Sequence, residues 1–163
     1  MGKKKKNKKD QPGELMVCTN SRALMRYNIG ERIEAGIVLS GSEVKSMRAK
    51  RADLEGSYAT IDGGELWLHK MYVGPYEQAG PFGHEAKQRR KLLVKSQEIK
   101  RLIGKLTVRG FTLIPIRVYF KNGWAKVELG LAKGKDVGDR RQDLKSKTAV
   151  REARAAVDAE RRR

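Results

Sequence analysis

The sequence predicts a mainly β protein whose strands close into a small antiparallel barrel flanked by short helices, within a chain of 163 residues. Apolar residues alternate with other residues in several runs, and links that contain glycine join neighbouring runs, as in β-hairpins. Only two short segments have the spacing of amphipathic helices. We expect a closed barrel because closure removes the exposed strand edges that invite aggregation. An open α+β sandwich is the alternative fold.

The first predicted strand covers residues 33–39, where apolar residues occupy every second position. Gly41 ends this strand. A short helix is expected to follow as far as Arg48, with Ser42 as its N-cap. Glu43 then lies in the first turn, where a carboxylate complements the helix dipole.

Two hairpins are predicted from their turn residues. An Asp-Gly-Gly link joins residues 58–61 to residues 65–73, and a Lys-Asn-Gly link joins residues 111–120 to residues 124–132. Pro115 lies inside the third of these runs and has no backbone N–H group. The sequence therefore predicts an edge position or a bulge at this proline.

The segment between the two hairpins contains a loop, a strand and a helix. Residues 74–91 combine several Gly and Pro residues with a basic run, which predicts a long loop without regular structure. Residues 92–94 form a brief apolar run typical of a strand. Four aliphatic residues between Ile99 and Leu106 follow the i, i+3, i+4, i+7 spacing of a helix that Ser96 opens and Gly110 ends.

Positive charge is the most unusual feature of the composition, since 37 Lys and Arg residues face 19 Asp and Glu residues. We divide the chain into a disordered basic segment (1–19), a folded barrel (20–132) and a basic tail (133–163). The net charges of these parts are +4, +9 and +5, so half of the excess belongs to the folded part. Such an excess predicts a polyanionic partner, and nucleic acid is the usual one. An anionic membrane surface is the alternative.

The two ends of the chain are too polar to pack by themselves. Residues 2–13 contain six Lys and no large apolar residue, which predicts disorder. In the tail, Lys147, Arg151 and Arg154 recur on one side of a possible helix. We expect this tail to be disordered when free and helical when its basic side meets phosphates.

Several classes of protein are excluded by composition. No apolar run approaches the roughly 18 residues of a membrane span, and none at the start resembles a signal peptide. The single cysteine and two histidines predict no disulfide, no metal site and a cytoplasmic location. No cofactor-binding motif and no catalytic residues are identified. An RNA-processing enzyme that uses the neighbouring His84 and Glu85 is the alternative activity.

Five motifs in order resemble the family of small protein B, the bacterial partner of transfer-messenger RNA (SsrA RNA). They are Glu34–Gly36, Gly41–Arg48, Arg90–Leu93, Tyr119–Gly123 and Leu129–Lys135. The resemblance covers residues 20–154. It implies an oligonucleotide-binding (OB) type of barrel that binds the tRNA-like domain of transfer-messenger RNA and catalyses nothing.

The resemblance also implies the biological setting. The protein delivers transfer-messenger RNA to stalled ribosomes in trans-translation, which rescues the ribosome and tags the nascent chain. Its tail becomes helical there, near the decoding centre, and occupies the empty mRNA channel of the small subunit. Alanyl-tRNA synthetase and elongation factor Tu are indirect partners, no membrane is involved, and the protein is a monomer.

The family's functional positions transfer to residues of this sequence. The implied RNA-binding residues are Asn20, Arg22, Glu34, Lys45, Ser46, Arg48, Leu93, Lys95, Lys121, Lys133 and Lys135. The implied ribosome-contacting residues of the tail are Asp139, Arg140, Arg141, Lys147, Arg151 and Arg154. Two positions depart from the family pattern: Asp136 replaces a usual lysine, and Gly138 stands where many members carry an aromatic or histidine.

Overall fold

The computed structural model describes residues 13–135, 146 and 148–153, and it is mainly β with short helices, as predicted. The expected disorder of residues 2–12 lies outside these residues. The helices are α1 (Ser21–Arg26), α2 (Gly41–Arg48), α3 (Ser96–Leu106) and the 3₁₀ helix η1 (Glu77–Phe82). The strands are β1 (Glu14–Thr19), β2 (Tyr27–Ile37), β3 (Ala52–Asp53), β4 (Tyr58–Asp62), β5 (Glu65–His69), β6 (Tyr72–Val73), β7 (Arg90–Leu93), β8 (Phe111–Lys121) and β9 (Trp124–Gly134).

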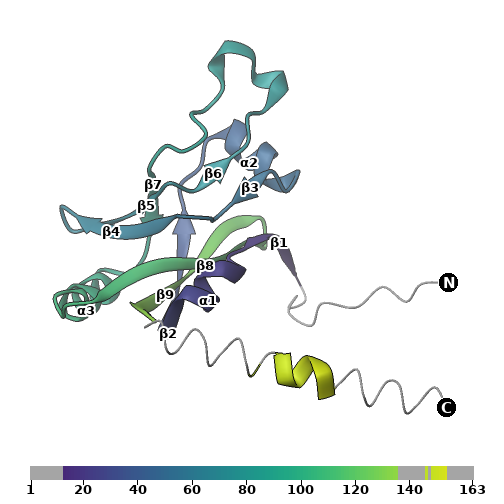
Figure 1. The fold of residues 1–163 in the computed structure, drawn as a ribbon. Coiled ribbons are helices and arrows are strands. Elements are labelled where there is room, and N and C mark those ends of the chain that lie inside the picture. The colour runs from purple at the N-terminus through teal and green to yellow at the C-terminus, as the bar shows by residue number, and fades with distance from the viewer. Residues whose placement is uncertain (1–12, 136–145, 147, 154–163) are drawn as a thin grey trace, which may run out of the picture.

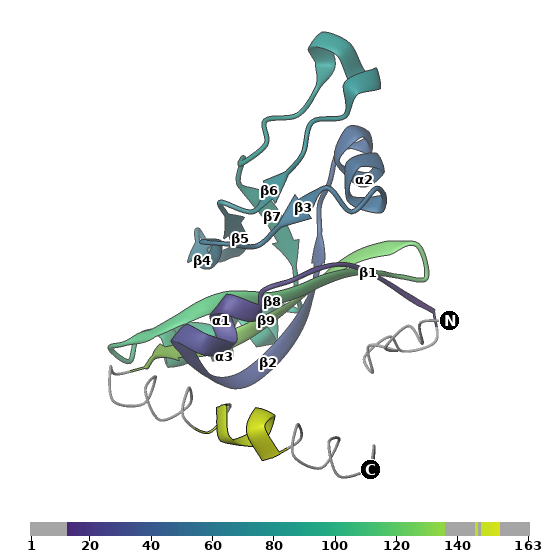
Figure 2. The same cartoon turned by 45° about the vertical axis from the view of Figure 1, so that its right-hand side comes forward.

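One antiparallel sheet of seven strands in the order β1-β8-β4-β5-β7-β2-β9 organises the described part of the chain. Strand β8 also pairs with β9, so the pairings of six strands return to β8 and form a ring. In Figure 1, β4, β5 and β7 lie above β8, β9 and β2, and α1 lies beside the lower strands. Strands β3 and β6 form a separate pair next to α2 (Figures 1 and 2).

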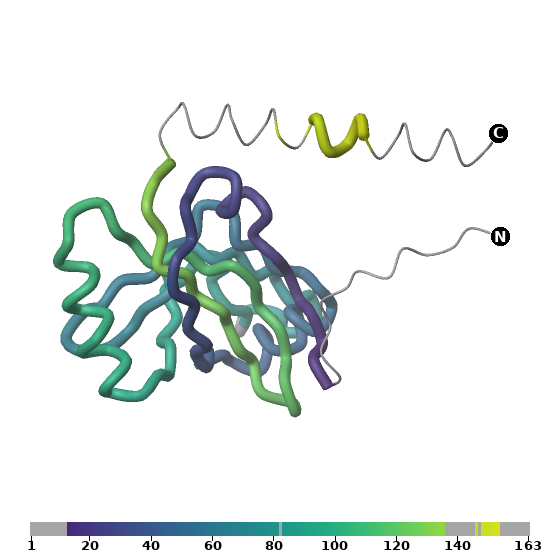
Figure 3. The backbone as a smooth tube through the Cα atoms, turned by 90° about the horizontal axis from the view of Figure 1, so that it is seen from below, coloured from purple at the N-terminus to yellow at the C-terminus, as the bar shows by residue number. Residues whose placement is uncertain are grey.

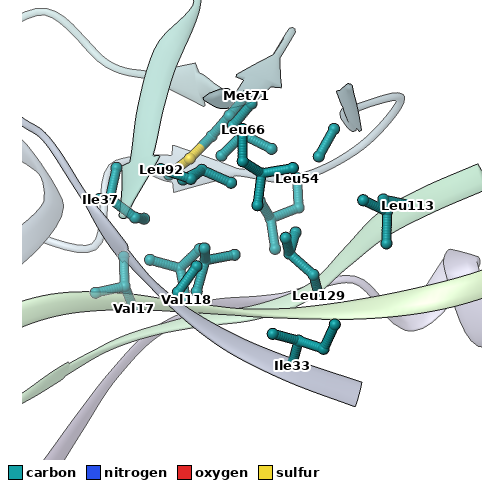
Figure 4. Packing of buried hydrophobic residues seen from close by; sticks show 14 of the residues in the cluster. Val17, Ile33, Ile37, Leu54, Leu66, Met71, Leu92, Leu113, Val118 and Leu129 are labelled. Atoms are coloured by element: carbon teal, nitrogen blue, oxygen red, sulfur yellow. The ribbon is translucent and has the colours of Figure 1, made fainter. Parts of the chain in front are cut away.

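The hydrophobic core fills the space between the upper and lower strands. Leu66, Met71 and Leu92 extend from above toward Val118 and Leu129 below (Figure 4). All five side chains are 2% exposed or less. Burial of such side chains contributes about 1.5–3 kcal/mol each, so this layer supplies the main force that holds the ring together.

The hairpin of β8 and β9 is confirmed in full. Asn122 and Gly123 take the positive φ angles of 50° and 84° that a tight turn needs. The register of β8 against β9 shifts between Pro115 and Arg117, which confirms the predicted bulge. Strand β8 is not an edge strand, but Pro115 itself pairs only with Leu129 of β9, because the pairing with β1 stops at Arg117 and the pairing with β4 is at Leu113.

The helix after β2 is confirmed, but its predicted N-cap is wrong by two residues. Ser40 caps α2, because Glu43 stands at the third helical position and its carboxylate accepts a hydrogen bond from Ser40 N over 2.8 Å. Ser42, which we expected to be the cap, instead makes a hydrogen bond to His84. The predicted hairpin of β4 and β5 and the helix α3 are confirmed.

Three expectations about irregular segments are corrected. Strand β1 lies inside the segment 1–19 and pairs with β8, so ordered structure begins before residue 20. The segment 74–91 contains η1 and the first residues of β7. The run 65–73 is divided between β5 and β6, because Lys70 takes a φ of 59° that ends the extended conformation.

Candidate nucleic-acid interface

Strands β2, β8 and β9 direct one side of each strand toward the core and the other side outward. Side chains alternate along a strand, so the neighbours of the buried Val118 and Val127 point outward. We call this surface the outer sheet face. Its polar and aromatic residues are Arg32, Glu34, Arg117, Tyr119, Lys121, Trp124, Lys126 and Glu128.

Carboxylates on this face separate and position its basic groups. Glu128 accepts hydrogen bonds from Arg117 and, over 3.0 Å, from Arg32. Glu14 of β1 lies 3.4 Å from Arg117 Nη1 and 4.0 Å from Lys121 Nζ. The side chains of Glu14 and Glu128 are only 3% and 11% exposed, so these carboxylates hold the arginine and lysine groups in place from below the surface.

Glu34 is the most connected carboxylate of the outer sheet face. It accepts a hydrogen bond from the hydroxyl of Tyr119, and its oxygens lie 3.9 Å from Lys121 Nζ and 3.7 Å from Lys126 Nζ. The bond from Tyr119 and the two lysines lower the pKa of Glu34, although partial burial opposes them. Burial and the bond to Glu34 raise the pKa of Tyr119. The pair is therefore a carboxylate and a neutral phenol at neutral pH.

The exposed basic residues of α2 lie next to one end of this face. The Arg48 guanidinium lies 5.5 Å from the ring centre of Phe120, the neighbour of Lys121 in β8. Lys45 Nζ lies 5.2 Å from the ring centre of Tyr76. Figure 2 shows the tip of the β8–β9 hairpin extending below α2. Arg48 therefore lies near the end of β8 that carries Lys121, although Phe120 faces the core and Lys121 points to the other side of the strand.

Three other predicted residues differ in accessibility. Ser46 is buried, and its Oγ donates a hydrogen bond to the Gly74 carbonyl over 2.6 Å, so it supports α2 from inside. Leu93 is 55% exposed and pairs across from Gly36 of β2. Lys95 is exposed at the start of α3.

Asn20 serves the fold rather than the surface. Its Oδ1 accepts from Ala23 N over 3.0 Å and so caps α1. Its Nδ2 donates to the carbonyls of Leu54 and Pro115 over 3.2 and 3.1 Å. The side chain is buried and bonded at both ends, so it joins α1 to the backbone at Leu54 and Pro115.

The remaining predicted basic residues of the ordered part lie around α1. Arg22 forms an ion pair with Glu55, and Lys133 is exposed near the end of β9. Lys135 Nζ donates to the Leu24 carbonyl over 3.2 Å. Figure 3 shows the end of β9 running beside α1. A cleft of about 230 Å³ in this region is lined by Asn20, Arg22, Ala23, Arg26, Tyr27, Glu55, Gly56, Ser57, Tyr58, Thr112 and Ile114.

The predicted RNA-binding residues Lys121 and Lys133 lie at opposite ends of β9, whereas Leu93 and Lys95 lie on β7 and at the start of α3. Lys121 belongs to the end where β9 begins, and Lys133 to the end where it finishes. Ten residues of a strand span about 33 Å, so the two lysines belong to separate surfaces.

Sequence reasoning missed Trp124, Lys126, Tyr119 and Arg117. The alternation of β9 contained the signal for two of them, because the inward positions of this strand imply that Trp124 and Lys126 point outward. The alternation of residues 111–120 likewise puts Val118 and Phe120 on one side and Arg117 and Tyr119 on the other, but it gives no sign that Tyr119 bonds to Glu34.

Of the implied ribosome-contacting residues, only Arg151 is described, as an exposed residue of the helical segment 148–153. Asp139, Arg140, Arg141, Lys147 and Arg154 lie outside the described residues, as do Asp136 and Gly138. No described helix is long and apolar enough to cross a membrane.

His84, which belongs to the alternative acid–base pair with Glu85, makes hydrogen bonds that hold the fold together. His84 Nδ1 lies 3.0 Å from Ser42 Oγ and Nε2 lies 3.2 Å from the Val73 carbonyl, so the ring joins α2 to the segment before η1. Within the described residues, His, Cys, Asp and Glu form no group of three that could hold a metal ion.

Comparison with known proteins gives one consistent result. The model of the SmpB protein family matches residues 17–159. The SsrA-binding protein of Desulforudis audaxviator is 56% identical over 144 residues, which cover 88% of this chain and 94% of the relative. That of Carboxydothermus hydrogenoformans is 48% identical over 90% of this chain and 98% of the relative. A chain in the solved structure "tmRNA-SmpB: a journey to the center of the bacterial ribosome" is 46% identical, with a TM-score of 0.63 over 74% of this chain and 85% of that chain.

Proposed function

The chain belongs to the SmpB protein family, and from this premise we propose that it binds transfer-messenger RNA and acts with it on the ribosome in trans-translation. Its relatives are named for binding SsrA RNA, and its structural neighbour is a tmRNA–SmpB structure. The protein is an RNA-binding factor and not an enzyme. It works in the cytoplasm as a monomer, and alanyl-tRNA synthetase and elongation factor Tu meet it through the RNA.

The observation that carries this proposal is the fixed array of basic groups on the outer sheet face and α2. Lys121 and Lys126 are held beside Glu34, and Arg48 lies next to the same strand end. A folded RNA is recognised mainly through phosphates, hydroxyls and unpaired bases, which requires basic groups at set positions on a rigid sheet. We assign the tRNA-like domain to this surface, and the group around α1 to a second set of phosphates.

The ring of six paired strands supports a closed barrel of the OB type as the scaffold of this surface. Proteins of that type bind nucleic acid on the outer surface of their strands and in the adjoining loops. The three-part division into residues 1–19, 20–132 and 133–163 remains part of the proposal, with β1 now joined to the barrel.

Electrophoretic binding of the full chain to the tRNA-like domain, with an ordinary tRNA of similar length as the matched control, tests the proposal. We expect clear preference for the tRNA-like domain. Equal weak binding to both RNAs would instead indicate a general basic protein attracted to any polyanion.

We also propose that the tail has a separate task, in the empty mRNA channel of the small subunit. A chain that stops after Lys135 should keep its affinity for the tRNA-like domain and lose tagging on stalled ribosomes. Loss of RNA affinity in this truncated chain would show that the binding surface includes the tail.

A further inference from the structure

An exposed apolar patch lies at the edge of the outer sheet face, formed by Trp124 of that face, Leu93 of β7 and Val38, the residue that follows β2. Trp124 is 74% exposed, Leu93 is 55% exposed and Val38 is 48% exposed. Exposed apolar residues are ordinary when scattered, but a group on one face marks a binding surface.

Strand register brings this patch together. Gly36 of β2 pairs with Lys126 of β9 on one side and with Leu93 of β7 on the other. Lys126 in turn pairs with Tyr119 of β8. One row across four strands therefore reads Tyr119, Lys126, Gly36, Leu93, and directly opposite strand positions lie about 5 Å apart.

Trp124 and Val38 extend this row toward the hairpin tip. Trp124 lies two residues before Lys126 on the same side of β9 and pairs with Lys121 of β8. Val38 lies two residues after Gly36, and its N–H group donates to the Lys91 carbonyl, so the alignment of β2 with β7 continues to this point.

The centre of the patch is a shallow depression, because Gly36 has no side chain. A Cβ atom at this position would lie 3.4 Å from Leu93 Cβ and 3.7 Å from Leu93 Cδ1, so the leucine lies against the bare backbone. The result is a shelf with Leu93 on one side and the Trp124 indole on the other. A flat aromatic group fits such a shelf better than a bulky aliphatic one.

The charges around the shelf identify the occupant. Lys126 Nζ lies 3.7 Å from Glu34, and Lys121 Nζ lies 3.9 Å from Glu34 and 4.0 Å from Glu14. Lys91, two residues before Leu93 in β7, forms an ion pair with Glu65. Apolar surface inside a rim of ammonium groups is complementary to a ligand that joins a flat ring to phosphates. A nucleotide of a single-stranded or looped RNA segment has this chemistry.

We propose that Trp124, Leu93 and Val38 form a base-stacking shelf that receives one unpaired nucleotide of the bound RNA, while Lys121 and Lys126 contact the phosphates beside it. This inference rests on the proposed function and adds a specific ligand subsite to it. Glu34 lies at the edge of the shelf, where its carboxylate can accept hydrogen bonds from amino groups of the base.

Tryptophan fluorescence tests the shelf directly. The chain has two tryptophans, so the Trp67→Phe variant leaves Trp124 as the sole indole while keeping a ring below Arg89, which lies 4.5 Å from the ring centre of Trp67. We expect the Trp124 emission to be quenched as the tRNA-like domain of transfer-messenger RNA is added, with the same Kd that electrophoresis gives.

Affinity measurements supply the second arm. Trp124→Ala should weaken RNA binding roughly 5- to 150-fold, because stacking of one base contributes about 1–3 kcal/mol and 1.4 kcal/mol is a factor of ten. Trp124→Phe should restore most of this loss. Neither variant should alter the salt dependence of Kd, because no phosphate contact is removed.

Tyr72→Ala is the matched control, since Tyr72 is also an exposed aromatic residue of a strand, 40% exposed, but belongs to the separate pair of β3 and β6. The RNA affinity of the Tyr72→Ala variant should equal that of the parent chain. Tight RNA binding with unquenched Trp124 emission and an unaffected Trp124→Ala variant would overturn the shelf and leave the proposed function intact. Absence of any preference for the tRNA-like domain would contradict the proposed function itself.

Discussion

The hydroxyl of Tyr119 in β8 donates a hydrogen bond to the carboxylate of Glu34 in β2, across the intervening strand β9. Three strands are thus joined on their outer side by two residues. A carboxylate is unexpected on a surface that we propose to bind phosphates, since like charges repel. The bond to Tyr119 and the nearby Lys121 and Lys126 explain its presence, because Glu34 holds in place the cations that we propose face the RNA.

The Tyr119→Phe substitution should release Glu34 and make the stability of the protein less dependent on acid pH. The folded-state pKa of Glu34 is lowered from its ordinary value of 4.5, so its stabilising effect is present above that pH and is lost as the pH falls through the lowered pKa. The parent should therefore be more stable than the variant at neutral pH, and the difference should shrink in acid. Urea unfolding of both proteins from neutral to acid pH measures this difference in the free energy of unfolding. A difference that is independent of pH would contradict the role of Tyr119 in lowering the pKa of Glu34.

The buried ion pair of Glu43 and Arg90 fixes the segment after β6 to α2. Both side chains are 2% exposed or less, and Arg90 Nε lies 2.8 Å from Glu43 Oε1. Arg90→Met should destabilise the fold by about 3–5 kcal/mol, because it leaves a buried carboxylate without its partner. Arg89→Met is the control, since the Arg89 side chain is 59% exposed, and it should cost about 1 kcal/mol or less. Equal losses in denaturant unfolding would mean that the buried pair has no special role.

Asn20→Ala should lower the free energy of unfolding and leave the dependence of RNA affinity on salt concentration unchanged. The variant loses the cap of α1 and leaves two carbonyls without their donor, which we expect to cost about 2 kcal/mol. Chemical unfolding measures the loss, and Asn28→Ala, at an exposed position of β2, is the control. A stable Asn20→Ala variant with a smaller salt slope of RNA binding would restore Asn20 as a direct RNA contact.

Lys121→Gln and Lys126→Gln should each reduce the slope of log Kd against log salt concentration by about one, because each removes one phosphate contact. Lys100→Gln, at an exposed position of α3 away from the outer sheet face, should leave the slope unchanged. Equal effects of all three substitutions would indicate diffuse attraction instead of a defined surface.

Local signals in the sequence were sufficient for the hairpin of β8 and β9 and for α3. The Asn-Gly turn and the helical spacing act between close neighbours, and both appear where they were predicted. Strand β1 could not be found in this way, because its partner β8 lies about a hundred residues later and its run Leu15 to Cys18 does not alternate.

The candidate site was predictable in residue type but not in arrangement. The family resemblance identified Glu34 and Lys121, which the structure brings together, and also Asn20, which it buries. Whether such a residue is exposed or buried depends on contacts between residues distant in sequence, such as the hydrogen bonds from Asn20 to Leu54 and Pro115. Tyr119 was missed for the same reason, since its partner Glu34 lies 85 positions away.

Residue-level NMR mapping of the full chain, as the tRNA-like domain of transfer-messenger RNA is added, would locate the RNA-binding surface directly. We expect the largest shifts of backbone and side-chain signals on the outer sheet face and α2, at Glu34, Arg48, Lys121, Trp124 and Lys126. Shifts concentrated on α3 and the β4–β5 turn, with the outer sheet face unaffected, would contradict the proposed RNA-binding surface.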